Sequence, residues 1–186
     1  MTSSVAADGA FGLRWAIPLS VLSGLLYFTG FAGFDQWYLM PFALVPLLVA
    51  TDRSGPWRSL LLGWLMGTVT NLGGYYWIVG MLDRFSGFPT PLCILFTVLL
   101  CAYQGLTFGV FSLLLALLRR RGVAPFFTGA AALVVVERFF PLLFPSFMGN
   151  SQYVHPLLIQ AADIGGPTLI SFFLASANFA LLEAIN

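Results

Sequence analysis

The side chains that could perform chemistry are few, and the most conspicuous is His155, the only histidine in the sequence. A catalytic histidine needs a nucleophile and an orienting acid within reach. Ser151 lies four residues earlier, but its surroundings do not resemble a nucleophile elbow. No cysteine or acidic residue accompanies His155 at the spacing of a zinc site. We therefore predict no catalytic residue and no metal site here, and we interpret His155 as an interface residue.

The two cysteines, Cys93 and Cys101, lie eight residues apart inside an uncharged stretch. A disulfide or metal pair would need polar companions, and none stands nearby. Both are interpreted as small hydrophobic residues of a helix. The sequence gives no sign of any cofactor.

The elements that hold these residues must be largely apolar. Of 186 residues, 59% are hydrophobic and 8% charged, whereas soluble domains carry about 25% charged residues. The net charge is +1, from scattered arginines without a single lysine, which excludes the basic face of a nucleic-acid-binding protein. The composition predicts an all-α integral membrane protein.

Charged residues and turns divide the chain into about six hydrophobic spans behind a loose N-terminus, residues 1–14. The single transmembrane domain would cover 15–186. The predicted spans are 15–34, 37–51, 59–80, 90–118, 124–138 and 167–186. The first hydrophobic stretch lacks a cleavage signature and is interpreted as a retained anchor.

Two parts of this pattern are irregular. The 15-residue span 37–51 would cover only ~22 Å of a ~30 Å membrane core, and it contains Pro41 and Pro46, so we expect a kinked helix. Segment 139–166 is proline-broken yet apolar, and we expect it at the membrane interface or packed on the bundle. Residues 81–89 are predicted to form a loop, and Asp163 to cap the last helix.

Two further patterns concern packing and orientation. Gly63 and Gly67 form a small-xxx-small face that lets another helix approach closely, and Gly105 and Gly109 form a second. If the spans alternate, six arginines fall on one side and two on the other. The positive-inside rule then places both termini in the cytoplasm.

Glu137 and Arg138 form an ionisable pair near the end of a predicted helix. Adjacent helical residues point ~100° apart, so the two do not face each other. The simpler interpretation is two charges reaching the outer interface; the alternative is that Glu137 orients the outer loop and a lipid headgroup. Tyr75 and Trp77 similarly suit an aromatic belt or the wall of a lipid cleft.

An ordered series of local patterns over about residues 20–180 resembles the apolipoprotein N-acyltransferases of bacterial envelopes. The series comprises Phe34-Asp35-x-Trp37, Ala43-Leu-Val-Pro-Leu-Leu48, Gly63-Trp64-x-x-Gly67, Gly74-Tyr75-Tyr76-Trp77-Ile78, Gly87-Phe88-Pro89, Glu137, Phe144-Pro145, Gly149-x-Ser151-Gln152 and Ile159-Gln-Ala-Ala-Asp163-x-Gly165.

The resemblance implies the membrane half of an enzyme of the bacterial inner membrane. In that family a phospholipid acyl chain is transferred to the α-amino group of the diacylglyceryl-cysteine of a lipoprotein. A nitrilase-like domain outside the membrane carries the Glu-Lys-Cys triad. The implied partners are phospholipid, the lipoprotein substrate and a separate nitrilase-like catalytic domain or chain. The resemblance makes Tyr75, Trp77, Glu137 and Gln152 the candidate residues of the lipid cleft.

The sequence departs from the family pattern in several places. It contains no lysine, so the Glu-Lys-Cys triad cannot be assembled from it. Ser146 stands where the family tends to have tryptophan, and the seventh helix, the catalytic domain and the last helix have no counterpart. We expect either a truncated gene or a diverged membrane module that works with a separate catalytic chain.

Three functions follow as hypotheses. The first is the membrane platform of an apolipoprotein N-acyltransferase, not catalytic by itself. The second is a non-catalytic scaffold or remnant. The third is a small transporter, which the absence of ionisable residues in the middle of the spans disfavours.

Overall fold

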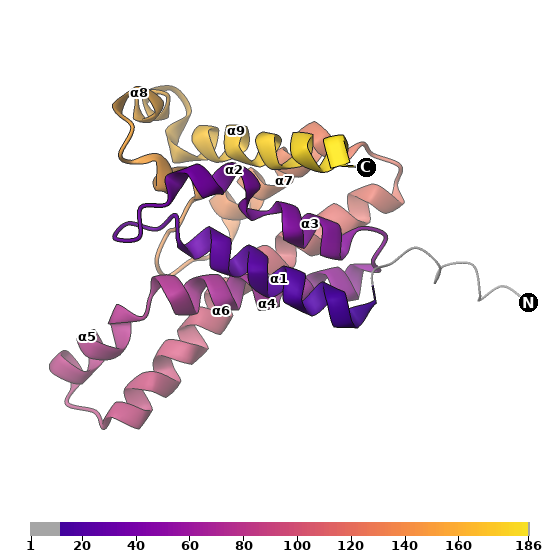
Figure 1. Ribbon diagram of the computed structural model, residues 1–186. Coiled ribbons are helices and arrows are strands. Elements are labelled where there is room, and N and C mark those ends of the chain that lie inside the picture. The colour runs from indigo at the N-terminus through magenta and orange to yellow at the C-terminus, as the bar shows by residue number, and fades with distance from the viewer. Residues whose placement is uncertain (1–11, 186) are drawn as a thin grey trace, which may run out of the picture.

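A computed structural model describes residues 12–185, and in that part the regular structure is entirely helical, as predicted (Figure 1). The elements in chain order are α1 (Leu13–Phe28), η1 (Trp37–Leu39), α2 (Met40–Ala43), α3 (Val45–Thr51), α4 (Pro56–Gly74), α5 (Trp77–Ser86), α6 (Thr90–Arg120), α7 (Pro125–Phe139), η2 (Met148–Gln152), α8 (Pro156–Ile159) and α9 (Ala162–Ile185). Of the N-terminus predicted to be loose (1–14), residues 1–11 lie outside the described part of the chain. Helix α1 starts at Leu13, so Arg14 belongs to that helix.

Two of the described helices, α6 and α9, are long and apolar enough to cross a membrane. Helix α1 and the stretch 37–51 are apolar but shorter. Length and composition therefore support membrane helices in this chain, while the six crossings stay a prediction.

The core lies between α1, α2, α3, α4, α6, α7 and α9, which together form the body of the molecule in Figure 1. Each of these helices contributes large side chains to it. They include Tyr27, Leu47, Phe111, Leu133 and Phe179, all at most 1% exposed. The chain thus buries a continuous apolar centre although much of its outer surface is also apolar.

Helices α4 and α6 pack with their backbones in direct contact, as the glycine patterns predict. A Cβ built on Gly67 would lie 2.4 Å from the carbonyl oxygen of Gly105, and one on Gly63 would lie 2.2 Å from that of Phe108. Both distances are below any normal contact, so these positions accept only glycine while the two helices stay this close.

The span predicted at 59–80 is two helices. Helix α4 ends at Gly74, Tyr75 leaves the helical region (φ −110°, ψ 20°), and α5 runs from Trp77 to Ser86. The expected loop at 81–89 is therefore shorter than predicted, since α5 continues past Asp83 to Ser86 and only residues 87–89 are non-helical; Gly87 caps α5 in a left-handed conformation (φ 67°). The last two residues of α4, Gly73 and Gly74, lower the helix propensity next to the break.

The break redirects the chain. Helix α5 and the first half of α6 project from the body as an arm at the lower left of Figure 1. The sequence predicts the end of a span at Asp83 and Arg84, but these charged residues end the apolar run without ending the helix.

The stretch 37–51 is irregular, as predicted, and α9 supports its break. Pro46 has no amide hydrogen for the helix ladder and its ring crowds the preceding turn, so the helix is interrupted between α2 and α3. Asn178 of α9 accepts a hydrogen bond from the Leu44 amide (2.8 Å) and donates one to the Met40 carbonyl (2.9 Å). One buried side chain therefore satisfies both backbone groups that the break leaves open.

Helix α9 begins earlier than the predicted residue 167 and contains a kink. Gly166 has φ 67° and ψ −177°, a conformation that essentially only glycine adopts, and Pro167 follows it. Asp163 lies in the first turn, before the kink. The predicted helix thus corresponds to the part of α9 beyond Gly166.

Candidate functional site

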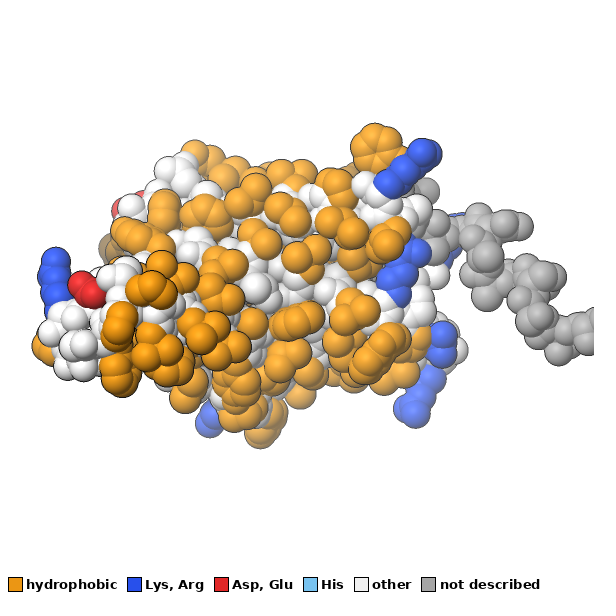
Figure 2. All heavy atoms as spheres, turned by 90° about the horizontal axis from the view of Figure 1, so that it is seen from below, with side chains coloured by type: hydrophobic (Ala, Val, Ile, Leu, Met, Phe, Trp, Pro, Cys, Tyr) orange, Lys and Arg blue, Asp and Glu red, His pale blue; other side chains and the backbone are white. Residues whose placement is uncertain are grey.

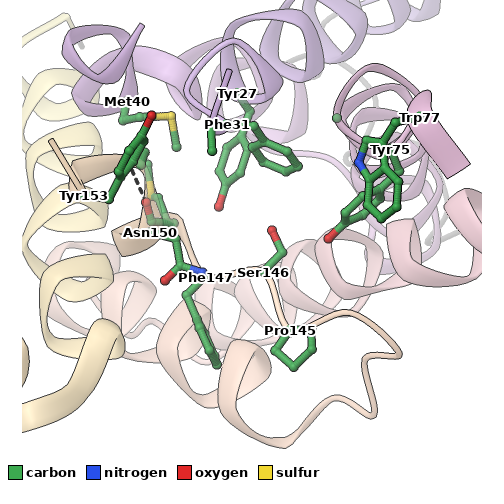
Figure 3. Close-up of a pocket in the computed structure, with 14 residues that line it drawn as sticks. Tyr27, Phe31, Met40, Tyr75, Trp77, Pro145, Ser146, Phe147, Asn150 and Tyr153 are labelled. Carbon is green, nitrogen blue, oxygen red and sulfur yellow. Dashed lines mark hydrogen bonds between the residues drawn. The ribbon is translucent and has the colours of Figure 1, made fainter. Parts of the chain in front are cut away.

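A cleft of about 380 Å³ opens at the end of the molecule where α1 ends and the arm begins. Figure 3 shows that its lining comes from four separate parts of the chain. Helix α1 supplies Tyr27 and Phe31, the α4–α5 junction supplies Tyr75 and Trp77, the third part is segment 145–153, and Met40 of α2 is the fourth. The cleft exists because α4 ends where it does and because the third segment is not a long helix.

Hydroxyl groups converge in this cleft. The side chains of Tyr27, Tyr75 and Ser146 point their oxygens toward its interior (Figure 3). Tyr27 is 1% exposed, and its buried hydroxyl has no hydrogen-bond partner among the described residues. The Tyr75 hydroxyl donates to the Phe144 carbonyl (3.4 Å) and lies within reach of Ser146. A buried unpaired hydroxyl is costly, and among the described lining residues Tyr27 is the one that carries such a group.

Glu137 lies behind the cleft and hydrogen-bonds the lining residue Met148. It is 3% exposed, and its Oε1 accepts a hydrogen bond from the Met148 amide (2.7 Å). The next amide, of Gly149, donates to Ser171 Oγ of α9 (2.9 Å). The interpretation of Glu137 as a charge reaching the outer interface is therefore wrong, whereas Arg138 is exposed. The buried carboxyl fixes the segment that follows α7.

Gln152 ties the same segment to η1. It is 2% exposed, and its amide nitrogen donates to the Trp37 carbonyl (3.2 Å) and to Ser151 Oγ (3.0 Å). Beside it, the exposed Tyr153 hydroxyl donates to Asp35 Oδ1 (2.5 Å), and this hydrogen bond raises the pKa of Tyr153. The hydrogen bonds of Gln152 and Tyr153 thus attach the end of η2 to residues more than 100 positions away in the sequence.

The four residues singled out in the sequence lie around this cleft in two roles. Tyr75 and Trp77 line it, and Glu137 and Gln152 position its wall from behind. Sequence reasoning did not single out Tyr27, because a tyrosine inside an apolar span looks like any other core aromatic. The sequence marks Ser146 only as a departure from the family pattern, whereas in the structure it lines the cleft.

The other chemistry-bearing residues form no catalytic group. The His155 ring packs edge-on against Trp37 with centroids 4.0 Å apart, and Ser151 donates to the Met148 carbonyl. Cys93 and Cys101 are free and fully buried, as expected for small hydrophobic residues. Within residues 12–185, no cluster of histidine, cysteine and acidic side chains could hold a metal ion.

The described lining of the cleft is apolar and neutral-polar. It combines aromatic and aliphatic surface with hydroxyls and backbone groups, without an acidic or basic side chain. Such a lining suits a ligand with an apolar part and a small polar part.

Comparison with known proteins places this arrangement in a family. Residues 23–180 match the apolipoprotein N-acyltransferase N-terminal domain. The chain is similar to the apolipoprotein N-acyltransferases of Geobacter metallireducens (29% identity, 90% of this chain, 33% of the relative) and Bdellovibrio bacteriovorus (31%, 75% and 26%). The same enzyme of Thermotoga maritima is 27% identical over 93% of this chain and 37% of its own length.

The chain spans about a third of the length of these curated relatives. The region that matches contains the whole cleft, from Tyr27 to Tyr153. The family match covers most of the chain and agrees with the resemblance seen in the motif series. This protein therefore belongs to the apolipoprotein N-acyltransferase family and carries that family's N-terminal domain.

Proposed function

We propose that this chain is the membrane-embedded platform of an apolipoprotein N-acyltransferase of the bacterial inner membrane. It supports the transfer of a phospholipid acyl chain to the N-terminal diacylglyceryl-cysteine of a lipoprotein. A nitrilase-like domain or chain supplies the catalytic residues, because this sequence contains no lysine for a Glu-Lys-Cys triad. The observation that carries the proposal is the cleft, whose apolar walls and inward hydroxyls suit an acylated substrate.

The proposed platform crosses the membrane six times. In support, Figure 2 shows a broad apolar surface over the middle of the molecule and arginines gathered toward one end. Exposed apolar side chains cover helices on all sides, including Leu22, Leu61, Leu99, Val135 and Phe173. Both ends of the described chain lie at the arginine-rich end, which the positive-inside rule assigns to the cytoplasm. The cleft then faces outward.

Cysteine labelling tests this orientation. With Ser86→Cys in the loop end of the arm, we expect a membrane-impermeant maleimide to label intact spheroplasts. With Ala124→Cys, before α7, we expect labelling only after the membrane is opened. Both positions are exposed, and the native cysteines are fully buried and give little background. Labelling of Ala124→Cys alone in intact spheroplasts would reverse the proposed orientation.

A binding and transfer assay on the purified chain tests the function. In detergent micelles, the chain is expected to bind a fluorescent diacylglyceryl lipopeptide but to form no N-acylated product from phospholipid. Tyr27→Phe should weaken this binding by about three- to tenfold, since a neutral hydrogen bond contributes about 1 kcal/mol. The fold should be unaffected, because the hydroxyl has no partner in the described part of the chain.

Tyr76→Phe is the matched control, since Tyr76 is 65% exposed and lies outside the lining. If wild type and Tyr27→Phe bind the lipopeptide equally well, the Tyr27 hydroxyl does not contribute to binding, and the proposed binding site in the cleft is wrong. N-acylated product formed by the chain alone would contradict its role as a platform, and absence of any lipopeptide binding would favour a scaffold or remnant.

A further inference from the structure

A second cavity, of about 470 Å³, lies at the opposite end from the cleft. It is formed where the turn between α3 and α4 meets the end of α6. Its lining is Arg53, Ser54, Gly55, Ala116, Arg119 and Arg120. Three of these six residues are arginines, and they come from two segments more than 60 residues apart.

Among residues 12–185, the positive charge of this cavity is only partly neutralised. Asp52 is the acidic neighbour, and its carboxylate lies 3.7 Å from Arg53 Nε and 3.9 Å from Arg119 Nη1. Both distances are long for charge-assisted hydrogen bonds. One carboxylate between three guanidinium groups leaves an excess of positive charge.

Arg119 is held in place by one hydrogen bond, and one of its nitrogens has no partner among the described residues. Its Nη1 donates to the Thr51 carbonyl (3.3 Å), which fixes the guanidinium against the end of α3. Its Nη2 is buried and has no hydrogen-bond partner among the described residues. The side chain is 18% exposed, so this donor is oriented by the fold.

The backbone adds to the same field. Gly55 lines the cavity and is the N-cap of α4, and the amide end of a helix carries a partial positive charge. Arg120 is close to this helix start, since a Cβ on Gly55 would lie 3.8 Å from Arg120 Nη2. Guanidinium groups and a helix N-terminus that meet in one cavity match the chemistry of a phosphate group.

We propose that this cavity binds the phosphate group of an anionic ligand. Its position favours a phospholipid headgroup as the source, because each of its two helices has an exposed apolar side chain two residues from a lining residue: Trp57 (71% exposed) after Gly55, and Leu117 (44%) before Arg119. Tryptophan at such a boundary is typical of the membrane interface. A soluble phosphate would use the same three arginines. The inference concerns the opposite end from the cleft and holds whether or not the proposed function does.

The test is the binding of dioctanoyl phosphatidylglycerol to the purified full chain in a neutral detergent at fixed ionic strength. The double variant Arg53→Gln/Arg120→Gln removes two cavity charges and keeps Arg119, which contributes to folding. We expect it to weaken binding by about tenfold or more, because charge-assisted contacts are lost. Arg14→Gln/Arg121→Gln removes two exposed charges at the same end outside the cavity, and it should change binding by less than about twofold.

A competition arm identifies the source of the phosphate. If glycerol phosphate at the same concentration does not displace the lipid, the ligand is a headgroup with its chains; if it does, the site serves soluble phosphates. Equal weakening by the two double variants would mean a diffuse charge effect and would overturn the proposal. Absence of phosphatidylglycerol binding to the wild-type chain, together with absence of glycerol phosphate binding, would also overturn it.

Discussion

Replacing Glu137 by alanine is expected to lower the free energy of unfolding by about 3 kcal/mol and to loosen the cleft wall that it supports. The carboxyl is 3% exposed and accepts the Met148 amide at 2.7 Å. Alanine removes this acceptor inside the protein, and the amide is then buried without a partner. The lost side chain also leaves a cavity between α7 and η2.

Glu137→Gln is the matched variant, because its amide oxygen can still accept the Met148 hydrogen bond at nearly the same volume. We expect Glu137→Gln to retain most of the stability that Glu137→Ala loses. SDS-induced unfolding in mixed micelles measures the first effect, and hydrogen exchange of the amides in segment 144–153 measures the second. If Glu137→Ala unfolds like wild type and its Met148 amide exchanges no faster, the carboxyl does not hold the cleft.

Replacing Gly67 by leucine is expected to separate α4 from α6 and to prevent a stable fold. Even a Cβ at this position would lie 2.4 Å from the Gly105 oxygen and 2.8 Å from Gly105 Cα. These are backbone atoms, so no rotamer change relieves the clash and a whole helix must move. Gly67→Ala alone should lower the free energy of unfolding by about 1–3 kcal/mol.

Gly80→Ala is the control within the same chain. Gly80 lies inside α5 and nothing stands within 4 Å of the position of its Cβ. Because alanine is the better helix former, Gly80→Ala should leave stability unchanged or raise it by up to about 1 kcal/mol. Both alanine variants are compared by SDS-induced unfolding and by yield after detergent extraction. If Gly67→Ala is as stable as Gly80→Ala, α4 and α6 can move apart without loss of stability, and their close contact does not stabilise the fold.

The amino-acid sequence was sufficient for several features of this protein. Composition alone predicts an all-helical apolar chain, because so few charged groups cannot cover a soluble surface. Pro41 and Pro46 predict the irregular stretch 37–51, since two prolines five residues apart each remove an amide hydrogen from the helix ladder. Gly63 and Gly67 predict a close helix contact, and the motif series indicates the family. These are local or compositional properties, and each acts within a few residues.

Only the tertiary structure decided which polar groups are buried and where the cleft lies. The burial of Glu137 depends on how the chain after α7 folds back on it, and the neighbours of Gln152 and Tyr153 lie in residues 35–37. The Tyr27 side chain lines a cleft only because segment 145–151 forms a wall of the same cleft. Such contacts join segments far apart in the chain, and a hydrophobic pattern with a period of one helical turn carries no information about them.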